Sequence, residues 1–110
     1  MVMNTRYADS EPSRAEIDAM TGPVLLEFGA PWCGHCQAAQ ALIAAALFPH
    51  QGMCHIKIED GRGRRLGRSF GVKLWPTLVF LRDGQEVARL IRPDDAESIR
   101  HALAQIDAAP

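Results

Sequence analysis

The sequence predicts an α/β fold built on a central mixed β-sheet. Three patterns predict it: two apolar runs separated by a helical pattern, two further apolar runs joined by a tight turn, and an amphipathic helix near the C-terminal end. The first pattern is typical of a parallel crossover unit and the second of an antiparallel hairpin, so a sheet that contains both is mixed. With 110 residues, the chain is long enough for one domain with a hydrophobic core and too short for two.

The chain begins with a polar segment, residues 1–12, which we expect to be an N-terminal extension with a short strand near residues 6–7. Ser13 and Glu16 stand at the spacing of a capping box, which predicts that a helix begins there. The Thr-Gly-Pro sequence at residues 21–23 predicts that this helix ends before it.

A crossover unit is predicted next. Residues 24–28 are apolar without regular alternation, so we expect a strand buried on both faces, in which Glu27 is anomalous. Residues 33–47 are predicted to form a helix and residues 54–58 the next strand. In such a unit a reactive group belongs at the carboxyl ends of the strands, which is where residues 33–36 lie.

The hairpin is predicted from residues 77–81 and 86–91, which flank Asp83-Gly84, a dipeptide suited to a two-residue turn. Before it, a short helix is expected around residues 62–70. After it, an aspartate is predicted to cap the last helix, and that helix has apolar residues at helical spacing that face the sheet. The candidate caps are Asp94 and Asp95, and the apolar residues are Ile99, Leu103 and Ile106.

Cys33 and Cys36 are the most informative residues of the chain. A Cys-x-x-Cys pair where a buried strand turns into a helix is typical of a redox-active dithiol. Residues three apart lie on the same side of a helical turn, so the two sulfurs can approach to bonding distance. Cys33 falls at the helix N-terminus, where unpaired N–H groups and the helix dipole favour its thiolate.

Residues 28–36, Phe-Gly-Ala-Pro-Trp-Cys-Gly-His-Cys, resemble the active-site segment of the thioredoxin superfamily, and their Gly-His dipeptide is typical of protein disulfide isomerase domains. Trp75-Pro76-Thr77, which opens an apolar strand, resembles the cis-proline segment of that family. The resemblance covers nearly everything from about residue 24 to the C-terminal helix. It implies a single thioredoxin-like domain over residues 1–110, with helices on both faces of the sheet, that acts as a thiol–disulfide oxidoreductase.

The resemblance also implies catalytic roles. Cys33 is expected to attack a partner's disulfide, and Cys36 to resolve the mixed disulfide, with the Cys33–Cys36 disulfide as the redox group and no metal or other cofactor. His35 is expected to stabilise the Cys33 thiolate. Glu27 matches the buried acid that takes the proton from the second cysteine, and Lys57 matches the lysine partner of that acid.

The same resemblance implies a substrate-binding surface. Trp32 is expected to flank the dithiol as a platform for substrate, beside Gly34. Pro76 is the candidate for a cis peptide that places the backbone of Trp75, next to Thr77, where an extended substrate can pair with it. The bulky Trp75 side chain is expected either to narrow this groove or to fill core space.

Three features depart from the family pattern. Gly29 stands where many thioredoxins carry a tryptophan, Ala41 replaces the usual helix-kinking proline, and residues 91–93, Ile-Arg-Pro, lack the glycine usual near the last strand. We expect these departures to affect the choice of partners rather than the disulfide chemistry.

Several residues have ordinary alternative explanations. His35 could be an exposed loop residue, Glu27 a strand-edge residue that reaches water, and Lys57 a solvated lysine. Cys54 is expected to be a buried, inert thiol. A basic cluster comprises Arg62, Arg64, Arg65 and Arg68. A solvated helix face explains this cluster better than the binding of acidic partners does.

Two other functions fit parts of the sequence. Cys33, Cys36, His50 and Cys54 have a spacing close to that of a structural zinc site, although the intervening helix would carry His50 away from Cys33. A thioredoxin-like interaction module with a vestigial or regulatory dithiol is the other alternative, because a fold does not fix a function.

The composition limits the partners. With 47% hydrophobic and 23% charged residues and a net charge of -1, there is no overall electrostatic case for nucleic acid or an anionic membrane. The expected partners are protein dithiol or disulfide substrates and an unidentified thiol reductase or oxidant, with the domain itself a monomer. No stretch has the apolar core of a secretory signal or the length of a membrane span, which makes the cytoplasm the default location, although a mature form that begins with an added methionine would leave no trace of a lost signal.

Overall fold

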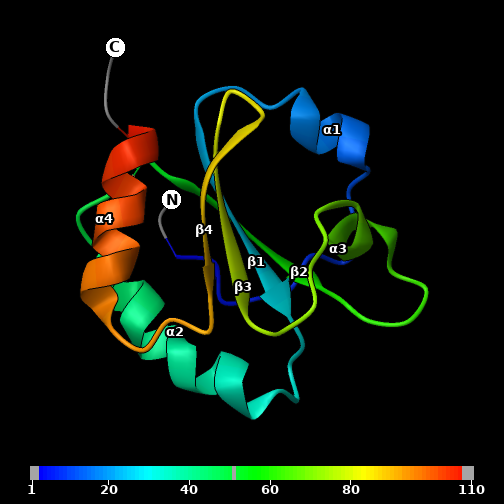
Figure 1. The fold of residues 1–110 in the computed structure, drawn as a ribbon, viewed down its shortest axis with the longest axis horizontal. Helices are drawn as coiled ribbons and strands as arrows, with labels where there is room; N and C mark the ends of the chain where they lie inside the picture. The colour runs from blue at the N-terminus through cyan, green and yellow to red at the C-terminus, as the bar shows by residue number, and fades with distance from the viewer. Residues whose placement is uncertain (1–2, 51, 108–110) are drawn as a thin grey trace.

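The computed structural model describes residues 3–50 and 52–107 (Figure 1). Its helices are α1 (Arg14–Asp18), α2 (Gly34–Leu47), α3 (Arg65–Ser69) and α4 (Ala96–Asp107). Its strands are β1 (Pro23–Gly29), β2 (Cys54–Glu59), β3 (Thr77–Arg82) and β4 (Gln85–Ile91). This order confirms the predicted crossover unit and the predicted hairpin.

The strands form one mixed sheet in the order β2-β1-β3-β4. β1 runs parallel to β2 and antiparallel to β3, and β3 runs antiparallel to β4. Tyr7 forms an isolated parallel bridge with Lys57, so the short strand expected near residues 6–7 is a single bridge on the outer side of β2. The N-terminal segment therefore packs against the sheet edge instead of standing apart as an extension.

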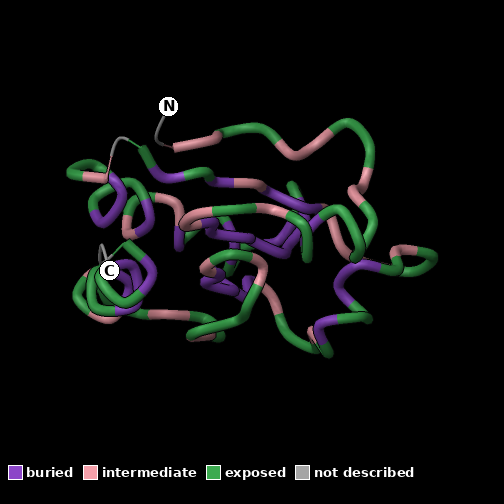
Figure 2. The backbone as a smooth tube through the Cα atoms, turned by 90° about the horizontal axis from the view of Figure 1, so that it is seen from above, coloured by how far each residue is buried: buried purple, intermediate pink, exposed green. Residues whose placement is uncertain are grey.

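Helices cover both faces of the sheet, which confirms the predicted fold class (Figure 1). Leu25 in β1 packs with α2 and α4 on one face, whereas its neighbours Val24 and Leu26 pack with α1 and with residues of α3 on the other. Because successive side chains of a strand point to opposite faces, one fully buried strand supports both cores. Figure 2 shows the buried segments gathered toward the middle of the molecule, with exposed segments around them.

Local sequence signals explain where the elements begin and end. Ser13 caps α1 and exchanges capping-box hydrogen bonds with Glu16. Asp83 and Gly84 have φ of 51° and 77°, which are the positive values that a type I′ hairpin turn requires. Asp95 accepts a 2.7 Å hydrogen bond from the backbone N–H of Ser98 and so caps α4, as one of the two expected candidates.

The third helix is shorter than predicted. It begins at Arg65, not near residue 62, because Gly61 and Gly63 take φ of 138° and 80°, which an α-helix cannot contain. No helix among residues 3–50 and 52–107 is long and apolar enough to cross a membrane.

Candidate active site

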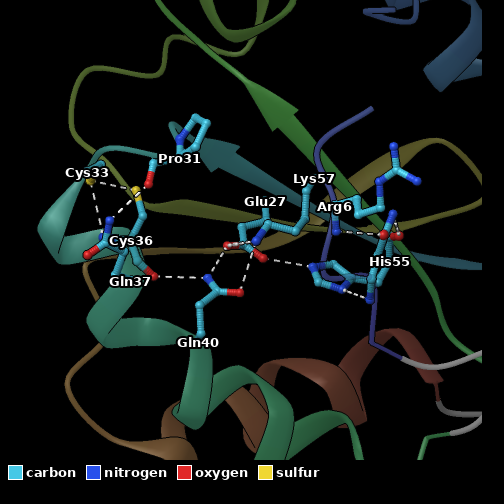
Figure 3. Close-up of polar contacts among 10 residues, drawn as sticks. Arg6, Glu27, Pro31, Cys33, Cys36, Gln37, Gln40, His55 and Lys57 are labelled. Carbon is cyan, nitrogen blue, oxygen red and sulfur yellow. Dashed lines mark hydrogen bonds and ion pairs between the residues drawn. The ribbon is translucent and has the colours of Figure 1, made fainter. Parts of the chain in front are cut away.

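The dithiol lies at the junction of β1 and α2. Cys33 is the N-cap of α2, with extended backbone angles, and its Sγ accepts a hydrogen bond from the backbone N–H of Cys36 at 3.2 Å. The thiol of Cys36 also donates to the Cys33 Sγ, with 2.6 Å between the two sulfurs (Figure 3). Two donors therefore converge on the Cys33 sulfur, as they would on a thiolate.

The two cysteines differ in exposure and in acidity. Cys33 is 8% exposed and Cys36 is 2% exposed, so Cys33 is the sulfur more open to a partner. Burial raises the pKa of Cys36 to about 12, helped by its hydrogen bond to Cys33 and by the negative charges of Cys33 and Glu27. Cys36 is therefore a neutral thiol near pH 7 and needs to lose a proton before it can attack.

Glu27 is the centre of a buried polar network beneath the dithiol. Its side chain is fully buried, so it does not reach water at a strand edge. Its Oε2 accepts a 2.7 Å hydrogen bond from the Nε2 of Gln40, which also donates to the backbone carbonyl of Cys36 at 2.9 Å. Gln40 thus bridges the carboxylate and the second cysteine, as the close-up shows (Figure 3).

Lys57 lies opposite Glu27 in the register of β1 and β2 and is 5% exposed, so it is not an ordinary solvated lysine. Its Nζ lies 3.9 Å from the Oε2 of Glu27 and donates to the Oε1 of Gln40 at 3.0 Å. The same Nζ lies 4.6 Å from the centre of the Tyr7 ring. Lys57 therefore joins the acid to the N-terminal segment.

Sequence reasoning missed His55, which offered no specific signal by itself. Its ring is buried, and its Nε2 lies 2.8 Å from the Oε1 of Glu27. The signal that could have found it is strand periodicity, because residues 55 and 57 of β2 share a face and flank the same acid. Gln40 was missed in the same way: it lies four residues after Cys36, on the same face of α2.

The bond between Trp75 and Pro76 is cis, as expected. The indole Nε1 of Trp75 donates to the Oδ2 of Asp60 at 2.9 Å, and the Trp75 ring meets the exposed ring of Trp32 edge-on, with 5.4 Å between centroids. The half-buried Trp75 packs against the cluster that contains both cysteines. These contacts hold the Trp75 side chain in a fixed position beside the dithiol.

Thr77 does not present its side chain to a partner. It is 1% exposed, and its hydroxyl donates to the backbone carbonyl of Leu74 at 2.6 Å. The expected role of Thr77 beside the substrate is therefore not a side-chain contact: its hydroxyl supports the loop that carries Pro76. Gly34, by contrast, is exposed, and apart from its chain neighbours and the adjacent backbone of α2 no atom lies within 4 Å of where a Cβ would stand.

His35 is exposed in the first turn of α2 and, within the described part of the chain, makes no hydrogen bond to Cys33. It lines a shallow hollow together with Arg92 and Pro93, which follow β4. The expected role of His35 at the Cys33 thiolate therefore stays a prediction, and any such effect acts through charge.

A cavity beside Cys36 opens toward the N-terminal segment. It has a volume of about 370 Å³ and is lined in part by Tyr7, Cys36, Gln40 and Lys57. A Cβ on Gly29 would stand 2.5 Å from the Cys36 Sγ and 3.3 Å from the Tyr7 hydroxyl, so this departure from the family pattern makes room for both groups.

The expected burial of Cys54 is wrong, because this first residue of β2 is exposed. Its expected inertness stays a prediction. Packing around the sulfur still raises the pKa of its thiol. His50 pairs with Asp107 at 2.6 Å, away from the dithiol, and no three His, Cys, Asp or Glu side chains of residues 3–50 and 52–107 are grouped to hold a metal.

Residues 5–105 match the model of the Thioredoxin family. The chain belongs to the thioredoxin family. Its Cys33–Cys36 pair is the Cys-x-x-Cys site of a thioredoxin-type thiol–disulfide oxidoreductase, held at the junction of β1 and α2 beside the cis Pro76.

Solved and curated relatives agree with this assignment. The reduced form of thioredoxin 2 from Pseudomonas aeruginosa PAO1 is 55% identical, with a TM-score of 0.85, over 96% of this chain and 97% of that one. Thioredoxin of Chlamydia muridarum is 30% identical over 90% of this chain and 89% of its own length. Human protein disulfide-isomerase A2 is 40% identical over 73% of this chain, which spans only 16% of that relative. This thioredoxin-family chain is thus similar to one domain of a disulfide isomerase and to whole thioredoxins.

Proposed function

We propose that this domain exchanges its dithiol with disulfides of protein clients, with Cys33 as the nucleophile and Cys36 as the resolving thiol. The observation that carries the proposal is the convergence of the Cys36 N–H and the Cys36 thiol on the Sγ of Cys33. These donors stabilise negative charge on the more accessible sulfur and hold the second sulfur ready to attack it.

The exchange proceeds in two displacements. The Cys33 thiolate attacks one sulfur of a client disulfide, so that a Cys33–client disulfide forms and the other client sulfur leaves as a thiolate. Cys36 then loses its proton and attacks the Sγ of Cys33, which forms the Cys33–Cys36 disulfide and releases the second client thiolate. The client has gained two electrons, and an unidentified thiol reductase restores the dithiol; with an oxidant in its place, the sequence runs in reverse.

The proton of Cys36 passes to Glu27. Gln40 places the carboxylate next to the backbone of Cys36, and the cavity beside Cys36 and Lys57 gives the proton an open route between the thiol, the network and solvent. Because burial raises the pKa of the Cys36 thiol, a base that takes its proton speeds the resolution of the mixed disulfide.

Clients bind against the surface formed by the side chains of Trp32 and Trp75. The backbone N–H of Trp75 makes no hydrogen bond within the described part of the chain, which leaves it free to pair with an extended client segment next to Pro76. Gly34, without a side chain, gives the client sulfur close access to Cys33.

The Gly34-His35 dipeptide gives this domain the character of a disulfide isomerase site, with a higher reduction potential than a Gly-Pro site would have. Its likeness to one domain of protein disulfide-isomerase A2 supports this finer assignment. The domain works as a monomer over residues 1–110 in a reducing compartment, the cytoplasm.

The proposal is tested by trapping. Cys36→Ser, incubated with cell extract and run on non-reducing gels, should accumulate covalent complexes that a thiol reductant releases, whereas Cys33→Ser should not. Cys54→Ser is the matched control and should behave like the parent. Equal trapping by both variants would contradict the assigned roles, and failure of the parent to reduce insulin while it still binds a client would indicate an interaction module.

A further inference from the structure

The imidazole of His55 is held at both nitrogens inside the protein. Its Nε2 lies 2.8 Å from the Oε1 of Glu27, and its Nδ1 accepts a 2.8 Å hydrogen bond from the backbone N–H of Asn4. The side chains of His55 and Glu27 are both fully buried. Asn4 also donates through its side-chain amide to the carbonyl of His55 at 3.4 Å, so the N-terminal segment is fastened to this strand.

The two contacts define the protonation of the ring. A backbone N–H can only donate, so the Nδ1 of His55 must carry a lone pair that faces Asn4. The single proton of the neutral ring then lies on Nε2 and points at the Oε1 of Glu27. An imidazolium would direct a second N–H at the Asn4 donor, so the contact excludes the charged form.

We propose that His55 is a positioning residue for the resolving step of the dithiol exchange. Its Nε2–H holds the Glu27 carboxylate in place to take the proton of Cys36, and Gln40 links that carboxylate to Cys36. This inference rests on the proposed function.

The geometry of the carboxylate supports this role. Oε1 receives the His55 proton, and Oε2 receives the Gln40 amide and faces Lys57 at 3.9 Å. Each oxygen is therefore directed by a different element, β2 on one side and α2 on the other. No buried side-chain nitrogen or oxygen of the described residues lacks a hydrogen-bond partner, so the network is complete as built.

The role depends on the other groups that face Glu27. His55 and Lys57 approach from β2, Cys36 and Gln40 approach from α2, and Tyr7 approaches from the N-terminal segment. Of these, Lys57 and the His55 Nε2–H favour the ionised carboxylate, whereas thiolate charge at the dithiol opposes it. Removing the His55 donor removes the contact to Oε1 and leaves the Gln40 amide and Lys57 at Oε2, without altering a cysteine.

The test compares His55→Leu, which removes the donor, with His55→Gln, whose amide can still donate to Glu27. Single-turnover reduction of insulin by the reduced protein is measured from pH 5 to pH 9, beside iodoacetamide labelling of Cys33. His55→Leu should reduce insulin about tenfold more slowly near pH 6 and move the acid limb of the profile upward by about one pH unit, as expected for a lost hydrogen bond to a charged group. His55→Gln should recover most of this loss, and the labelling of Cys33 should not change.

A double-mutant cycle separates positioning from packing. In the Glu27→Gln background, His55→Leu should cost little further activity, because the acid that it positions is absent. His101→Gln, an exposed histidine of α4, is the matched control and should leave the profile unchanged. An unchanged profile in His55→Leu, or full additivity with Glu27→Gln, would overturn the inference, whereas an inactive parent would overturn the proposed function itself.

A measurement without substitutions stands beside the variants in case His55→Leu does not fold. Nitrogen NMR of the ¹⁵N-histidine-labelled parent at pH 7 should show a neutral His55 ring with its proton on Nε2, and the signal should move in Glu27→Gln. A protonated ring, or a proton on Nδ1, would contradict the proposal.

Discussion

Arg92 donates a hydrogen bond from its Nε to the backbone carbonyl of Trp75, with 2.8 Å between the two atoms. Arg92 follows β4 with a φ of 51°, a conformation that usually favours glycine, and its own N–H donates to the carbonyl of Pro76 at 2.9 Å. The residue thus places an exposed guanidinium beside the cis-proline loop, where the family pattern has no side chain. The proposed client groove therefore carries a fixed positive charge at one end.

Replacing this residue should change which clients react fastest. Arg92→Gly is expected to lower the preference for peptide disulfides with acidic flanking residues over basic ones by up to about fivefold, the range of an exposed charge pair. The measurement is the ratio of the two reduction rates at low and at high salt, since screening should weaken the preference in the parent. Arg92→Lys, which keeps the charge, should retain most of it. The same ratio of reduction rates in the parent and in Arg92→Gly would show that the groove does not distinguish clients by their charge.

Removing the acid altogether should cost stability. Glu27→Ala is expected to lower the free energy of unfolding by about 3 kcal/mol or more, because the buried Nε2–H of His55 loses its acceptor and the buried Lys57 loses its nearby opposite charge. Urea unfolding of the reduced protein measures this change. Glu86→Ala, at an exposed ion pair with Arg89, is the matched control and should cost less than 1 kcal/mol. Equal costs in the two variants would show that the buried network contributes no more than a surface pair.

Part of this network could be predicted from the sequence. Glu27 breaks an apolar strand, and the family resemblance, counted back from Pro76, assigns Lys57 as the partner of that acid. His55 could not be assigned, because its partner Asn4 is 51 residues away in the sequence and no local pattern indicates how the N-terminal segment docks. The exposure of Cys54 was missed for a related reason: strand character predicts that one face is buried but not how far along the strand the helices cover it.

The acidity of Cys36 makes a prediction about alkaline stability. Burial raises the folded-state pKa of this thiol to about 12, well above the range of an ordinary cysteine. A raised pKa means that the folded state holds the proton more tightly, so its contribution to stability is complete below about pH 9 and is lost as the pH rises toward 12. Burial raises the pKa of Tyr7 as well, which adds loss in the same direction at still higher pH.

We therefore expect the free energy of unfolding of the reduced protein to fall between pH 9 and pH 11, and to fall less steeply in Cys36→Ala. Chemical unfolding at a series of pH values, under a non-thiol reductant, measures the slope. Cys54→Ser is the control, because the pKa of that thiol is also raised and its removal separates the two contributions. Parallel slopes for Cys36→Ala and the parent would show that Cys36 does not hold its proton more tightly when the protein is folded.

The last prediction concerns His35, whose replacement by proline converts the Gly-His dipeptide into the Gly-Pro of thioredoxins. If the imidazolium stabilises the Cys33 thiolate, it stabilises the reduced state, so His35→Pro should make the reduction potential more negative. A stabilisation of 1.4 kcal/mol corresponds to about 30 mV for a two-electron couple. Because His35 is exposed and not hydrogen-bonded to Cys33, the effect depends on its charge. Equilibration of variant and parent with glutathione buffers measures the potential. The control is His101→Gln, because proline at residue 101 would break α4. A potential that stays the same or becomes less negative in His35→Pro would show that this histidine does not tune the dithiol.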